Sequence, residues 1–135
     1  MNAVFGRRST AIDAQGLARN LVGATWLGGA IFNALWTVRQ SNPWLWLEES
    51  PLPIYEWFFG EVVGKNPAAW TIGLIVGEIA LGVLTLAHGK WRQIGLICGA
   101  LFSAFLFSLA VPYTLTMGGF VLLLGWLAHR ERSRV

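Results

Sequence analysis

One carboxylate stands out in the sequence because it lies inside an apolar stretch. Glu78 is the single charged residue between Trp70 and Ala87. An ionised carboxylate in hydrocarbon costs several kcal/mol unless it is neutralised, paired or hydrated, so such a residue is expected to have a specific partner or a function. Three alternatives are open for Glu78: a protonated side chain that hydrogen-bonds to another helix, a contact for a proton or a quinone headgroup, and an ion pair with a partner subunit.

Further polar residues occur at a similar depth in the other apolar stretches. If these stretches are helices with a rise of 1.5 Å per residue, Asn33 lies about two turns from the end of its helix. The polar side chains that we expect near Glu78, in one half of a bundle, are Asn33, Ser103 and Thr116. No Lys or Arg of the sequence falls at this depth, so an ion pair within the chain is not expected.

The other residues that commonly carry chemistry do not form a site in the sequence. His88 and His129 are expected at the same edge of the bundle, which does not suit a haem held between two histidines. Cys98 is the one cysteine, so it has no partner for a disulfide or a metal pair, and we expect it to be a small hydrophobe buried midway along a helix. We therefore expect no metal and no intrinsic cofactor. Redox chemistry would require electrons on a bound molecule, such as a quinone, or on another subunit.

The composition indicates the environment in which these residues lie. Of the 135 residues, 55% are hydrophobic and only 13% are charged, whereas a soluble domain has about 25% charged residues. A soluble domain of this size could not hide so much apolar surface. The apolar runs approach the roughly 20 residues that cross a bilayer. The predicted fold is all-α, a single four-helix membrane domain with spans at about 20–39, 69–88, 93–111 and 113–129 and a long loop at 40–68.

The basic residues predict how this bundle is oriented. Lys and Arg are retained in cytoplasmic loops, so an even number of spans with both termini cytoplasmic fits best. We expect Arg19 to extend toward the lipid headgroups. Nucleic-acid binding is not expected, since no basic patch with interleaved aromatic residues faces one surface. Eight of the ten basic residues then lie on the cytoplasmic side of a prokaryotic-type plasma (inner) membrane, and the remaining two are Arg39 and Lys65.

The loop at 40–68 is unusual because it is rich in aromatic residues and glutamates. From Pro53 onward, an apolar face with helical spacing is formed by Ile54, Trp57, Phe58, Val62 and Val63, with Glu56 and Gly60 on another face. This pattern predicts a short amphipathic helix that lies at the outer interface or caps the bundle. Whether the segment is an aromatic anchor, a lid over a ligand or a docking surface for a partner is open.

Glycines at intervals of four predict where helices approach closely. Gly73 and Gly77 have this spacing in the second apolar run, and Gly95 and Gly99 have it in the third. Rows of small residues let the backbones of membrane helices come into contact. We expect both rows to lie at contacts within the bundle.

Three segments together resemble a known family. They are GLIVGEIALGVLTL (73–86) with the basic turn KWR (90–92), IGLICGALF (94–102), and GATWLGGAIFNAL (23–35). The chain resembles the DoxX/DoxD-like family of small four-helix membrane proteins over most of residues 20–128. Glu78 matches the acidic residue of the family and Arg92 its turn residue. Where the family often has a Lys near the end of the first helix, this chain has Asn33-Ala-Leu-Trp36.

The resemblance implies two alternative functions. Some relatives are subunits of a thiosulfate:quinone oxidoreductase, and others are assembly partners of larger membrane complexes. We expect a membrane subunit of a quinone-linked redox system, or else a non-catalytic accessory subunit; a transporter comes third. The expected partners are the lipid bilayer and other membrane subunits or copies of the chain. The expected ligand-binding residues are Glu78, Asn33, Ser103, Thr116, Trp57 and Phe58, with no catalytic residue among them.

Overall fold

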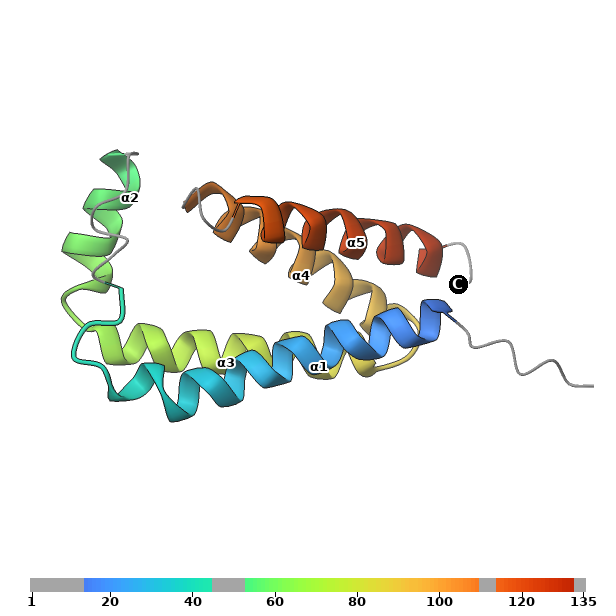
Figure 1. Cartoon of the computed structure of the whole chain (residues 1–135), viewed down its shortest axis with the longest axis horizontal. Coiled ribbons are helices and arrows are strands. Elements are labelled where there is room, and N and C mark those ends of the chain that lie inside the picture. The colour runs from blue at the N-terminus through green and yellow to red at the C-terminus, as the bar shows by residue number, and fades with distance from the viewer. Residues whose placement is uncertain (1–13, 45–52, 110–113, 133–135) are drawn as a thin grey trace, which may run out of the picture.

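The computed structural model describes residues 14–44, 53–109 and 114–132, and this part of the chain is all-helical. Figure 1 shows two antiparallel helix pairs, with a shorter helix standing across one end of them. The elements are α1 (Ala14–Leu35), the 3-10 turn η1 (Thr37–Arg39), α2 (Pro53–Trp57), the π-helical turn η3 (Phe58–Val63), α3 (Pro67–Leu86), α4 (Lys90–Leu109) and α5 (Thr114–Arg132).

The four long helices pack as α1 against α3 and α4 against α5, with α3 also contacting α4. The tight α3–α4 turn lies at the same end of the bundle as the start of α1 and the end of α5 (Figure 1). We call this the inner end. The opposite end, where η1, α2 and η3 lie, is the outer end. The predicted helix at 53–63 is confirmed, and it caps the outer end as α2 and η3.

Local sequence explains where α3 begins and how it turns into α4. The Asn66 side chain accepts a hydrogen bond from the backbone N–H of Ala69, and Pro67 occupies the first turn, where its missing N–H costs nothing. At the other end of α3, Gly89 has φ of +60°, a left-handed conformation that glycine adopts without a Cβ clash. A turn this short places α4 directly beside α3.

Small residues do bring the helices together, but only one of the two predicted glycine rows is involved. A Cβ at Gly95 would lie 2.7 Å from the backbone of Thr85, and one at Gly99 would touch Trp26 at 3.4 Å. The prediction for Gly73 and Gly77 was wrong, because a Cβ at either position would meet nothing within 4 Å. Spacing alone does not reveal which face of a helix meets a neighbour.

An ion cluster closes the inner end of the bundle. Arg19 of α1 and Arg92 of α4 both donate to Glu131 of α5, at 2.7 Å and 3.1 Å. The three side chains are only 7% to 14% exposed. The expectation that Arg19 extends to the lipid headgroups was therefore wrong, because its guanidinium finds a carboxylate inside the protein. We call Arg19, Arg92 and Glu131 the inner ion cluster.

The outer surface of the helices is apolar over much of its area. Among the described residues, 22 large hydrophobic side chains are exposed. The segments Ala14–Arg39 and Pro67–Leu86 are long and apolar enough to cross a membrane, and only 22% and 28% of their apolar windows are buried in the protein. Most of the surface of these two helices is therefore not covered by the rest of the protein. Cys98 is exposed, which contradicts the expectation that it is buried.

The inner ion cluster predicts a large stability effect at one carboxylate. In Glu131→Ala, two largely buried guanidiniums lose their shared partner, so we expect the free energy of unfolding to fall by about 3 kcal/mol or more. The matched control is Glu61→Ala, which removes an exposed i,i+4 pair with Lys65 whose side chains are 64% and 72% exposed. It should cost less than about 1 kcal/mol. Equal effects in a detergent unfolding titration would contradict this assignment.

Candidate functional site

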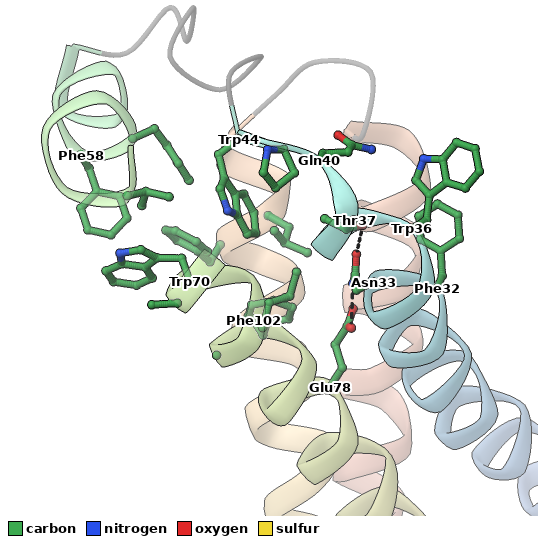
Figure 2. A pocket seen from close by; sticks show the side chains of 18 residues that line it. Phe32, Asn33, Trp36, Thr37, Gln40, Trp44, Phe58, Trp70, Glu78 and Phe102 are labelled. Atoms are coloured by element: carbon green, nitrogen blue, oxygen red, sulfur yellow. Dashed lines mark hydrogen bonds between the residues drawn. The ribbon is translucent and has the colours of Figure 1, made fainter. Parts of the chain in front are cut away.

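A cavity of about 1000 Å³ opens at the outer end of the bundle. Residues of α1, η1, η3, α3 and α4 and of the 40–44 segment line it (Figure 2). This volume is at the upper end of the range for small-molecule sites, which are concave and mostly apolar with a few polar groups. We call it the outer cavity.

Apolar residues form most of the wall of the outer cavity, and eight of the 18 lining residues are aromatic. The Phe58 ring packs edge-on against the rings of Phe59 and Trp70, with centroids 5.4 Å away in both cases. Trp44 stacks on Phe59 at 6.2 Å, and its indole N–H donates to the backbone oxygen of Pro67. The remaining aromatic lining residues are Phe32, Trp36, Phe102 and Phe105. Such a wall fits a flat or long apolar molecule.

A short hydrogen-bond relay forms the polar part of the wall. The Thr37 hydroxyl donates to Oδ1 of Asn33 at 2.6 Å, and Nδ2 of Asn33 donates to Oε2 of Glu78 at 2.8 Å. Figure 2 shows the three side chains in line, from η1 through α1 to α3. We call Thr37, Asn33 and Glu78 the outer relay. Because Thr37 follows Asn33 by four residues, the two side chains lie on the same face one turn apart.

The position of the Glu78 carboxyl depends on a glycine in the facing helix. Glu78 is buried, and a Cβ added at Gly29 of α1 would lie 2.8 Å from Oε1 of Glu78. A side chain at position 29 would therefore displace the carboxyl from its present place. Among the described residues, no Lys or Arg pairs with Glu78, and the neutral amide of Asn33 donates a hydrogen bond to it.

The arrangement can bind a molecule that has a polar head and an apolar body. The outer relay offers amide, hydroxyl and carboxyl groups at one place, and Gln40 adds a second amide to the lining. Among the described residues, no cluster of three or more His, Cys, Asp or Glu side chains could hold a metal ion. Covalent chemistry is not evident from these groups, whereas recognition by hydrogen bonding is.

The structure brings together three of the six predicted site residues. Glu78, Asn33 and Phe58 all line the outer cavity. Ser103 is fully buried in α4 without a hydrogen-bond partner among the described residues, and it is not part of the lining. Trp57 is 59% exposed and lies in a shallow hollow beside Glu61, away from the outer cavity. Thr116 falls within α5, but its side chain lies outside the described part of the structure.

The packed face of the capping helix matches the predicted one only in part. Phe59 and Val63 are its buried residues, whereas Ile54 and Trp57 are exposed. Of the two buried residues, Val63 was predicted on the apolar face and Phe59 was not. The segment contains a π-helical turn, in which the Gly64 N–H bonds to the oxygen of Phe59, five residues earlier. A wider turn moves each following side chain around the helix axis, so ordinary α-helical spacing predicts the packed face only approximately.

Several contributors to the site were not predicted. The Tyr55 hydroxyl is 2.6 Å from the Ser108 hydroxyl, and the Tyr55 ring packs edge-on against Phe105, so Tyr55 joins the capping helix to α4. Thr37 and Trp70 were also missed. Thr37 follows Asn33 by four residues, and this spacing indicates that the two side chains share a helix face. Tyr55 and Ser108 are 53 residues apart, so no local pattern indicates their contact.

No protein-family model, curated protein or solved structure matches the chain. The resemblance to the DoxX/DoxD-like family therefore stays a prediction made from the sequence.

The contact between Gly29 and Glu78 predicts different effects for two adjacent substitutions. Gly28→Ala introduces a methyl group with nothing within 4 Å, so it should stabilise α1 by up to about 1 kcal/mol. In Gly29→Ala the carboxyl of Glu78 must move away from Asn33. We therefore expect the free energy of unfolding of this variant to be about 1 to 3 kcal/mol lower than that of the unchanged chain. A detergent unfolding titration of both variants checks this. Equal stabilities would mean that Gly29 does not hold Glu78 in place.

Proposed function

We propose that the chain is a four-span membrane protein with both termini on one side. The apolar exposed surface and the two helices of spanning length support a membrane environment. The helices α4 and α5, with 20 and 19 residues, pair with each other and are similar in length to α3. In a bilayer that α1 and α3 cross, the pair α4 and α5 would cross as well. Most basic residues then lie at the inner end, which fits a cytoplasmic side.

Within this membrane domain, we propose that the outer cavity binds a quinone or another lipophilic molecule with a hydrogen-bonding head. The observation that carries this proposal is the placement of the outer relay in the wall of a cavity of about 1000 Å³ that is otherwise largely apolar. Pockets with a few polar groups on an apolar wall bind ligands through burial and are made specific by those groups. The chain would then serve as a ligand-binding subunit of a quinone-linked redox system.

The chemistry of a quinone fits the residues that are present. Its flat ring matches a wall of Trp and Phe side chains, since aromatic rings pack favourably edge-to-face or offset. Its oxygens need hydrogen-bond partners, and Asn33 has a second amide hydrogen besides the one that it gives to Glu78. In this proposal the electrons pass to or from another subunit.

Filling the outer cavity should weaken ligand binding without harming the fold. Gly73 lines the cavity, and a Cβ there would meet nothing within 4 Å. We expect Gly73→Leu to raise the Kd of a short-chain quinone by about tenfold or more, since a loss of about 1.4 kcal/mol is sufficient. Trp36, Trp44 and Trp70 line the cavity, so quenching of tryptophan fluorescence in nanodiscs reports binding.

The matched control for this experiment is one turn away on the same helix. Gly77→Leu adds the same side chain at a position that also has open space but does not line the outer cavity. This variant should bind the quinone as the unchanged chain does. Saturable quenching that survives Gly73→Leu, or that is lost equally in both variants, would place the ligand elsewhere. Quenching that never saturates would mean that the quinone merely dissolves in the bilayer.

A second function is favoured by a different observation at the outer end. Ile54 and Trp57 of α2 are 68% and 59% exposed, and they lie three residues apart on the same side of the helix. A paired apolar surface on a capping helix is suited to contact with another membrane subunit. We propose as the alternative that the chain is a non-catalytic accessory or assembly subunit that binds its partner through α2.

Substitutions in the capping helix separate the two functions. If α2 docks a partner, Ile54→Ser with Trp57→Ser should release a stoichiometric partner during purification from native membranes while quinone quenching is retained. Phe58→Ala should have the opposite effect, because Phe58 lines the outer cavity. Copurification measured by mass spectrometry checks this. If both sets of variants retain the same copurifying proteins, α2 is not the docking surface.

A further inference from the structure

The inner end carries an exposed patch of basic and aromatic residues that the proposed function does not use. It consists of two cation–aromatic pairs on adjacent helices. The Nζ atom of Lys90 lies 5.7 Å from the centroid of the Trp91 ring, and the guanidinium carbon of Arg130 lies 4.9 Å from that of Trp126. All four side chains are exposed, as is that of Arg132. We call these five residues the inner basic patch.

The inner ion cluster holds the two halves of this patch at the same level. Lys90 and Trp91 belong to the first turn of α4, where Arg92 is located, and Arg130 and Arg132 flank Glu131 in the last turn of α5. The bond from Arg92 to Glu131 therefore fixes the start of α4 beside the end of α5. Because the carboxylate of Glu131 is engaged by the cluster, it does not neutralise the exposed cations.

The exposed cations of this end form no ion pair with a carboxylate in the part of the chain that the structure describes. Within the described ranges, no salt bridge involves Lys90, Arg130 or Arg132. The outer end differs, because Lys65 pairs there with Glu61 at 3.3 Å and Glu56 is also exposed. The inner basic patch thus presents net positive charge, whereas the charges at the outer end are mixed.

The order of side chains along each helix indicates what would cover the patch. On α5, Arg130, Trp126 and Leu122 follow one another at intervals of four residues. A cation, an aromatic ring and an aliphatic chain therefore lie one after another on one exposed face, about 6 Å apart along the helix axis. On α4, Lys90 and Trp91 are followed, in the direction away from the inner end, by exposed Ile94 and Ile97. Charge, aromatic ring and aliphatic chain succeed one another in the same direction on both helices.

This order corresponds to the layers of a phospholipid leaflet. A phosphate headgroup would meet the cations, the glycerol region would meet the tryptophans, and the acyl chains would lie along the aliphatic side chains. An acidic peptide or a nucleic acid would leave the aliphatic residues without a partner. We propose that the inner basic patch binds anionic phospholipid, a site that rests on the membrane placement proposed above but not on the outer cavity.

Lipid selectivity in a bilayer tests this proposal directly. The full chain is reconstituted in phosphatidylcholine vesicles that contain spin-labelled phosphatidylglycerol or spin-labelled phosphatidylcholine, and the motionally restricted fraction of each label is measured. We expect a preference of about fivefold or more for phosphatidylglycerol, since each basic residue near an anionic surface contributes roughly that factor. The combined variant Lys90→Gln, Arg130→Gln, Arg132→Gln should lose most of the preference.

The control neutralises the described basic residues of the opposite end. Arg39→Gln with Lys65→Gln should retain the preference for phosphatidylglycerol. Equal association of both labelled lipids with the unchanged chain would overturn the proposal, as would the same loss in the control variant. Loss of the preference on adding inorganic phosphate at constant ionic strength would show a free-anion site and would overturn it too. If the chain does not float with vesicles at all, the membrane placement itself fails, which is a different result.

Discussion

The arrangement at the outer end depends on how one carboxyl group is accommodated among apolar side chains. No Lys or Arg pairs with Glu78 among the described residues, and the Asn33 amide donates a hydrogen bond to one of its oxygens. Unpaired polar groups away from water are costly, so this hydrogen bond fixes which faces of α1 and α3 meet. Gly29 provides the space for the carboxyl, and Thr37 fixes the orientation of the amide by donating to its oxygen. The hydrogen bond therefore determines local packing as well as the polarity of the cavity.

The two ends of the bundle differ because different interactions close them. At the inner end, Glu131 joins α1 to α4 and α5 through two arginines, so three helices are held together by one side chain. At the outer end, packed aromatic rings and the Tyr55–Ser108 contact hold the capping helix against the bundle. A cavity lies beneath this helix. Figure 1 shows the short capping helix at the outer end only. In the function proposed above, a lipophilic molecule enters and leaves at this end.

Sequence patterns predicted the helices well because hydropathy and helix-capping signals are local. The start of α2 was predicted from Pro53, and Glu78 was identified by its isolation in an apolar run. The cap of α3 by Asn66 with Pro67 is also a local signal, although the predicted span began at residue 69 without it. Asn33 was placed at the right depth by counting residues. Depth, however, does not give the face of a helix, which is why Ser103 was grouped with the site although it points into the core. The cluster around Glu131 was missed because residues 19, 92 and 131 are far apart in the chain and none has a distinctive spacing. The packed face of the capping helix was predicted only in part: Val63 was identified and Phe59 was not, and no residue type indicates the π turn in which both lie.

In the proposed function, Glu78 and its neighbours hold a lipophilic molecule in the outer cavity. Mass spectrometry of the small molecules that copurify with the chain from native membranes tests this, for the unchanged protein and for Glu78→Gln. We expect a lipophilic molecule with a hydrogen-bonding head, near one per chain, that is lost from the variant while its helical content is unchanged. Recovery of the same molecule in equal amount from both proteins, or a larger complex in which this chain carries no such molecule, would overturn the proposal.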